Sequence, residues 1–140
     1  MKKFYTLIDH TADICIKVKG KTLEDLFSNA GAAVFDIIAE RQKESNKAEL
    51  KKFVIEQEAD NLDDLFINWL NELLSLSAAR EVIFTEFKFN TLHDTFLSAV
   101  AFGEDSGDFK INTEIKAATY HELLIKKSAG GYSAQVILDV

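Results

Sequence analysis

Asp9, His10 and Asp13 place two carboxylates and an imidazole within five residues near the start of the chain. The apolar run 4–8 precedes them and a second apolar run, 14–18, follows. A polar segment between two strand-like runs usually lies at the end of a sheet, where side chains converge. Carboxylates grouped in this way suit a hard cation such as calcium or magnesium, which prefers oxygen ligands. The alternative is a plain turn whose Asp and Thr side chains bond to nearby backbone groups.

Two more carboxylates end the chain. Asp139 and Val140 directly follow the strand-like run 132–138, so the Asp139 side chain and the α-carboxylate of Val140 lie close together. If this strand neighbours the one that begins after Asp13, three carboxylates meet at one end of a sheet. Three carboxylates this close repel one another unless a cation neutralises their charge. A frayed and solvated terminus is the alternative.

Other kinds of site have weaker support. Zinc needs three or four nitrogen or sulfur ligands at close spacing, and the dispersed histidines leave open only a site through His10 and His121. A nucleophilic site built from Cys15 and His10 also needs an orienting acid, which the spacing does not supply. Residues 20–22 (Gly-Lys-Thr) resemble the end of a phosphate-binding loop but lack its first glycine, so a turn with a helix cap is expected there.

Composition limits the function classes. The chain has 140 residues, 47% of them hydrophobic, which indicates one globular domain over residues 1–140. Its net charge of −7 makes direct, stable nucleic-acid binding unexpected and favours cations or a basic protein partner. The single cysteine and the absence of a leader peptide indicate the cytoplasm. No apolar run approaches the ~20 residues that span a membrane.

Hydrophobic periodicity predicts the elements that position these residues. A helix is expected from a cap at Thr22 to about Glu40, and a second helix opens at Asn61 with Trp69 in its buried stripe. Strands are expected before, between and after the helices. In the run 95–102, Phe96, Val100 and Phe102 are expected to face the core, and residues 90–94 are expected to form the turn that precedes it. This order predicts an α+β fold with a mostly antiparallel sheet and two main helices packed on it. The expected strands cover residues 4–8, 14–18, 53–55, 82–89, 95–102, 114–127 and 132–138.

Several of these segments together resemble the archease family. They fall in the family's order and span nearly the whole chain. The most specific feature is that His-Thr-Ala-Asp near the start occurs together with Lys-Ala-Ala-Thr-Tyr-His near the end. The segments are His-Thr-Ala-Asp-Ile at 10–14, Gly-Lys-Thr-Leu-Glu at 20–24, Trp-Leu-Asn-Glu-Leu-Leu at 69–74, Ile-Lys-Ala-Ala-Thr-Tyr-His at 115–121, and the terminal Asp139.

The resemblance implies a function. Archeases are small α+β proteins that assist the RtcB-type RNA ligase, which joins RNA ends in tRNA splicing and repair using GTP and a divalent metal. They are not ligases themselves, but promote guanylylation of the ligase and restore its turnover. The family's metal site falls on Asp13, Asp139 and Val140, with calcium the usual assignment and magnesium or manganese as alternatives. Asp9, His10 and His121 are expected close to these ligands.

The chain departs from the family at two places. Cys15 stands where the family commonly has glycine, and the short segment 105–112 lacks a histidine often found there. The metal site is expected to survive both changes, whereas the partner surface near that segment is less secure. Two other function classes remain open: a small metal-dependent enzyme with Asp9, His10 and Asp13 in acid–base roles, and a chaperone-like binding module without a metal. A homodimer also remains open.

Overall fold

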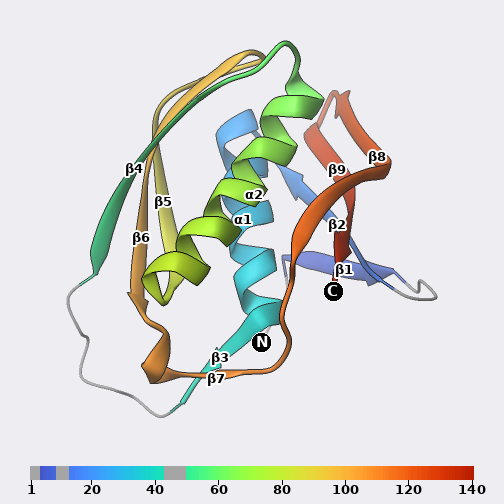
Figure 1. Ribbon diagram of the computed structural model, residues 1–140. Helices are drawn as coiled ribbons and strands as arrows, with labels where there is room; N and C mark the ends of the chain where they lie inside the picture. Colours follow the sequence, from blue (N-terminus) through green and yellow to red (C-terminus); the bar gives the residue numbers. More distant parts are fainter. Residues whose placement is uncertain (1–3, 9–12, 43–49) are drawn as a thin grey trace.

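A computed structural model describes residues 4–8, 13–42 and 50–140. Two helices, α1 (Leu23–Ile38) and α2 (Leu62–Arg80), lie between two antiparallel sheets (Figure 1). This arrangement confirms the predicted α+β class and the two main helices. None of the helices in the described part of the chain is long and apolar enough to cross a bilayer.

The strands divide between two larger sheets and one short pair. The four-stranded sheet has the order β1 (Tyr5–Ile8), β2 (Ile14–Gly20), β9 (Gly131–Asp139), β8 (Ala117–Ser128). The three-stranded sheet has the order β4 (Lys51–Glu58), β6 (Phe96–Asp105), β5 (Val82–His93). The short strands β3 (Ala39–Arg41) and β7 (Phe109–Ile111) pair with each other, and a 3₁₀ turn (Ser106–Asp108) links β6 to β7.

Both helices begin at the predicted caps. The Thr22 hydroxyl accepts a hydrogen bond from the Asp25 backbone N–H at 3.1 Å, and the Thr22 N–H donates to the Asp25 carboxylate at 3.3 Å. These two bonds form a capping box, in which Asp25 takes the place of the usual Glu or Gln. Asn61 caps α2 by accepting from the Asp64 N–H at 2.8 Å. Residues 20–22 therefore form the predicted turn and helix cap and not a phosphate-binding loop.

Trp69 lies at the centre of the core between the helices and the three-stranded sheet. Its ring is fully buried, and its indole N–H donates to the Phe27 carbonyl at 3.0 Å. The ring centroids of Trp69 and Phe89 are 5.0 Å apart, and those of Trp69 and Phe87 are 5.6 Å apart. The prediction that Trp69 serves packing is confirmed.

The prediction for the faces of β6 is wrong. Leu97, Ala99 and Ala101 are fully buried beneath the helices, whereas Phe96 and Phe102 lie on the opposite face, outside the core. Val100 shares that outer face. The large rings of β5 and α2 fill the inner space, so the strand contributes small side chains there. Because both faces of β6 are apolar, hydrophobicity alone did not distinguish them.

Some predicted boundaries also move. The strand expected to stop at Phe89 continues to His93, since two irregularities in its pairing with β6 let it extend through the predicted turn. The first helix ends at Ile38 because the chain there enters β3, which pairs with β7. The charged and polar run 41–51, which the sequence predicts to be an exposed loop, lies mostly outside the described residues.

Candidate functional site

The two ends of the chain meet in the four-stranded sheet. β2 and β9 pair antiparallel over their whole length, and Ile14 lies opposite Leu138. The next residues outward are Asp13 and Asp139, so this register continued by one step puts the two aspartates opposite each other. Residues directly opposite in antiparallel strands have Cβ atoms about 5 Å apart. The juxtaposition expected from the sequence is therefore present in the strand pairing.

Strand alternation places both aspartates on the outer face of this sheet. Ile14 and Leu138 turn toward the helices, where Leu138 is fully buried, so the residues next to them turn away. Asp13 is half-buried and Asp139 is exposed. Val140, the last residue of the sequence, is 39% exposed and directly follows. Among the described residues at this end of the sheet, Asp139 and Val140 are thus exposed to solvent.

Backbone bonds hold the chain end in the sheet. The Lys116 N–H donates to the Asp139 carbonyl at 2.7 Å, and Ala117 lies opposite Asp139. One residue on, the Asn71 side chain of α2 bridges the backbone of Ala118, accepting from its N–H at 2.8 Å and donating to its carbonyl at 3.2 Å. The alternative of a frayed terminus is thus wrong for Asp139, which is anchored through β8 to a helix.

An apolar pair lies beside the aspartates on the same outer face. Cys15 and Ile137 are opposite each other and almost completely buried, although neither belongs to the core between the sheets. The Thr119 hydroxyl donates to the Ile137 carbonyl at 3.0 Å. Burial, together with the nearby charge of Glu122, raises the pKa of the Cys15 thiol. The thiol is therefore kept neutral at physiological pH, which argues against Cys15 as a nucleophile.

Glu122 reaches this face because β8 is irregular. The pairing of β8 with β9 breaks between Thr119 and Leu124, and Glu122 has a left-handed backbone with φ of 53°. The Gln135 side chain donates to the Glu122 carbonyl at 3.4 Å, and the Glu122 carboxylate lies 3.3 Å from Nε2 of His121. Glu122 is not predictable from the sequence as part of this site, since no periodic signal indicates an irregular strand at that point.

The other predicted neighbours are placed less fully. His121 lies on β8 with its side chain 69% exposed and is in contact with Glu122. Asp9 and His10 lie outside the described residues. Within 4–8, 13–42 and 50–140, no group of three His, Cys, Asp or Glu side chains is arranged to hold a metal ion. The zinc site through His10 and His121 gains no support.

The donor set at the sheet end still fits a hard cation. Asp13 and Asp139 have carboxylate side chains there, and the main-chain oxygens of Val140, the third predicted ligand, directly follow Asp139. These are all oxygen donors, the type that calcium, magnesium and manganese prefer. Without a cation, carboxylates this close repel one another, at an exposed site that water only partly screens.

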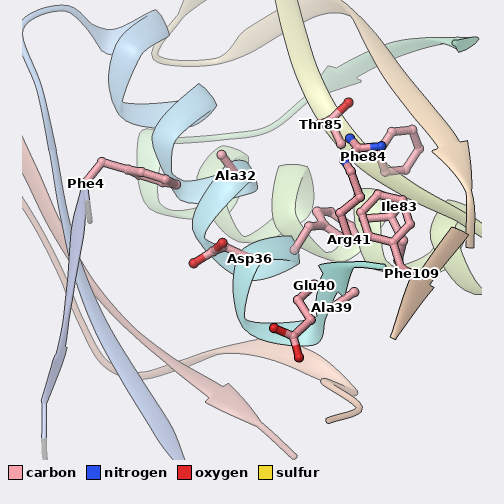
Figure 2. A pocket seen from close by; sticks show the side chains of 11 residues that line it. Phe4, Ala32, Asp36, Ala39, Glu40, Arg41, Ile83, Phe84, Thr85 and Phe109 are labelled. Atoms are coloured by element: carbon pink, nitrogen blue, oxygen red, sulfur yellow. The ribbon is translucent and has the colours of Figure 1, made fainter. Parts of the chain in front are cut away.

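A groove of about 470 Å³ lies away from the aspartates. Figure 2 shows Phe4 on one side of α1, and Arg41, Ile83 and Phe109 on the other side. The Arg41 guanidinium lies 5.0 Å from the centre of the Phe109 ring. Both of its terminal nitrogens bond to Glu104, the only charged residue that is buried in the described part of the chain. The positive charge of Arg41 in this groove is thus neutralised by Glu104.

Comparisons with known proteins agree with the fold. The sequence matches the Archease protein family (MTH1598/TM1083) over residues 5–140. Protein archease of Methanosarcina barkeri is 38% identical over 144 aligned residues, which cover 99% of this chain and 97% of that protein. The solution structure of Methanobacterium thermoautotrophicum protein 1598 is 29% identical, with a TM-score of 0.73 and coverage of 99% of this chain and 100% of that one.

A crystal structure from Thermotoga maritima has the same fold. It is described as an archease, possible chaperone, is 20% identical, and has a TM-score of 0.62 over 95% of this chain and 94% of that one. At this identity the likeness concerns the fold alone. The family match over nearly the whole length and the relative at 38% identity carry the assignment. The chain belongs to the archease family.

Proposed function

We propose that this chain is a non-catalytic protein cofactor that activates an RtcB-type, GTP-dependent RNA ligase in tRNA splicing or RNA repair. In this proposal it promotes guanylylation of the ligase and allows repeated turnovers. A divalent cation, calcium first and magnesium or manganese as alternatives, is held by Asp13, Asp139 and the carboxylate of Val140. The observation that carries the proposal is the pairing of β2 with β9, which brings Asp13 and Asp139 to one end of a sheet.

The charge distribution supports a role beside a nucleotide-dependent enzyme. A ligase that binds RNA, GTP and metal needs a positive active-site mouth, because it must attract phosphates. A chain of net charge −7 with accessible carboxylates at one sheet end is electrostatically complementary to such a mouth. A bound cation would supply charge that stabilises the attack on the nucleotide phosphate.

The chain's own residues hold this end of the sheet in place. Asn71 and Lys116 fix the backbone of β8 and of Asp139, which supports a preorganised chain end at the proposed site. Such preorganisation lowers the entropy lost when a ligand binds. The buried Cys15–Ile137 pair packs next to the aspartates and supports this end of the sheet. A partner would meet the charged edge.

The test is a ligation assay with an RtcB-type ligase, GTP, limiting divalent metal and excess RNA ends. We expect wild-type protein to raise the number of turnovers per ligase and the rate of guanylylation, and Asp13→Asn or Asp139→Asn to abolish both effects. Asp94→Asn, in the exposed β5–β6 turn, is the control with the same change in charge. If both site variants stimulate as well as the control, the metal-dependent proposal is wrong.

A chaperone-like role without a metal is the second candidate, and the Thermotoga maritima archease, which shares the fold, is described as a possible chaperone. This role predicts that the protein suppresses aggregation of unrelated unfolded proteins and that a chelator has no effect. Ligase activation through a bound metal predicts no suppression of aggregation, and it predicts that a chelator abolishes the effect. An independent enzyme activity would instead appear as turnover of RNA or nucleotide by this protein alone.

A further inference from the structure

The outer face of the three-stranded sheet carries a regular grid of side chains. Figure 1 shows that both helices pack on the other face of this sheet, so the grid faces outward. The central strand β6 contributes mainly apolar residues, and the flanking strands contribute charged ones. The four rows, each read across β4, β6 and β5, are Lys52–Phe102–Glu86, Val54–Val100–Lys88, Glu56–Ser98–Thr91 and Glu58–Phe96–His93.

The centre of this grid is unusually apolar for an outward sheet face. Val54 is 74% exposed, and Phe96, Val100 and Phe102 are half-buried without contacting the core. Two lysines partly cover one ring: the ammonium groups of Lys52 and Lys88 lie 5.9 Å and 5.7 Å from the centre of the Phe102 ring. Such contacts hold the aliphatic stems of the lysines against the sheet and extend the apolar area.

The order of charges is self-complementary under a two-fold rotation parallel to β6. This rotation stacks two copies face to face, keeps each row at its own level and exchanges β4 with β5. Lys52 then meets Glu86 of the second copy, and Glu58 meets His93 of the second copy, while each residue of β6 meets itself. No two like charges face each other in any of the four rows.

We infer from this pattern that the outer face of the three-stranded sheet binds a second copy of the chain, forming a two-fold symmetric dimer. The rotation perpendicular to the strands is less favourable, because it places the Glu56 carboxylate over Val54 and Ser98 over Val100 of the other copy. In the chosen arrangement Val54 meets Lys88 of the other copy, whose aliphatic stem can cover it while the ammonium group reaches the rim. Nucleic acid fits the face poorly, since its three glutamates outnumber its two lysines.

The size of the patch indicates a weak dimer. Three strands about 4.8 Å apart and four rows about 7 Å apart give a face of roughly 10 by 20 Å before side chains are added. Such a patch buries on the order of 1,000 Å² in total, the lower end for specific interfaces, so a dissociation constant in the micromolar range is expected. Because Asp13 and Asp139 lie on the other sheet, the dimer leaves both candidate sites accessible.

Sedimentation velocity of the full chain, over a concentration series that brackets the micromolar range, tests this inference. We expect a reversible monomer–dimer equilibrium for the wild type. Lys52→Glu and Glu86→Lys each turn two attractive pairs into repulsive ones, so each should raise the dissociation constant roughly tenfold or more. The double variant Lys52→Glu/Glu86→Lys restores opposite charges and should return the constant to near the wild-type value.

Lys126→Glu is the matched control, because it changes the net charge as Lys52→Glu does but lies exposed on β8 of the other sheet. It should leave the dimer unchanged. All three positions of substitution are exposed, so circular dichroism should show the same fold for every variant. A chain that stays monomeric throughout the series, single variants that dimerise like the wild type, or a double variant no better than the single ones would each overturn the inference.

Discussion

The buried ion pair between Arg41 and Glu104 gives a prediction whose size follows from the structure. The Glu104 side chain is 8% exposed and the Arg41 side chain 41%. Hydrogen bonding to Arg41 holds the pKa of Glu104 below its ordinary value, even though burial acts in the opposite direction. The substitution Arg41→Met keeps an unbranched side chain at this position but removes the guanidinium from the Phe109 ring and leaves the Glu104 carboxylate buried without its cation.

The free-energy cost of this substitution has an upper limit. Removing one partner of a buried pair costs about 3–5 kcal/mol. Glu104 can avoid this cost by taking a proton, and bringing a carboxyl of ordinary pKa 4.5 to the neutral form at pH 7 costs about 3.4 kcal/mol. The partly exposed position of Arg41 lets water reach the carboxylate. We therefore expect a loss of about 2–3 kcal/mol in the free energy of unfolding at pH 7.

The pH dependence separates this explanation from a simple loss of packing. In the wild type the folded pKa of Glu104 is lowered, so the contribution of the pair is fully present above the ordinary pKa and is lost as pH falls from there through the lowered, folded pKa. In Arg41→Met, burial alone raises the folded pKa, so the variant loses stability as pH rises. The difference between the two proteins should therefore shrink between pH 7 and about 4.5.

Urea denaturation at both pH values measures this difference. Lys110→Met is the control, since Lys110 forms an exposed ion pair with Glu40 at 3.8 Å in the neighbouring β3–β7 pair and should cost less than about 0.5 kcal/mol. The reasoning fails if Arg41→Met costs no more than the control. It also fails if the difference from wild type is the same at the two pH values.

Three further substitutions test other parts of the structure. Asn71→Ala removes both bonds to the Ala118 backbone and should cost about 2 kcal/mol in urea denaturation, while Asn29→Ala, which loses one exposed bond to the Lys19 carbonyl, should cost less. Trp69→Phe leaves the Phe27 carbonyl without its buried donor and should cost about 2 kcal/mol or more; an unchanged melting temperature would contradict the assigned bond. Gly131→Ala adds a Cβ 2.4 Å from the Gly20 carbonyl oxygen at a φ of 126° and should cost about 1–3 kcal/mol, whereas Gly130→Ala meets no atom within 4 Å and serves as its control.

Local signals in the sequence predicted the helices well. The Thr22 and Asn61 caps and the buried stripe around Trp69 depend on residues within one or two turns, and the structure has all of them. The faces of β6 were not predictable in this way, because both sides of the strand are apolar: Leu and Ala lie on one side and Phe and Val on the other. Which side is buried depends on helices that come from other parts of the chain.

The candidate site depends on contacts between distant segments. Asp13 and Asp139 approach each other only because β2 pairs with β9, and no local pattern predicts which strands of a sheet become neighbours. The family resemblance supplied that pairing before the fold was known. Glu122 and the Arg41–Glu104 pair were missed. The first depends on an irregular stretch of β8, and the second joins the three-residue strand β3, which is too short to show alternation, to the end of β6.

Titration calorimetry with calcium tests the central claim most directly, because it asks whether Asp13 and Asp139 bind one cation together. We predict one calcium ion per wild-type chain, with binding lost in Asp13→Asn and equally lost in Asp139→Asn, and retained in Asp94→Asn. Binding of calcium, magnesium and manganese that is the same in both site variants as in the wild type, or no binding by the wild type, would contradict the account.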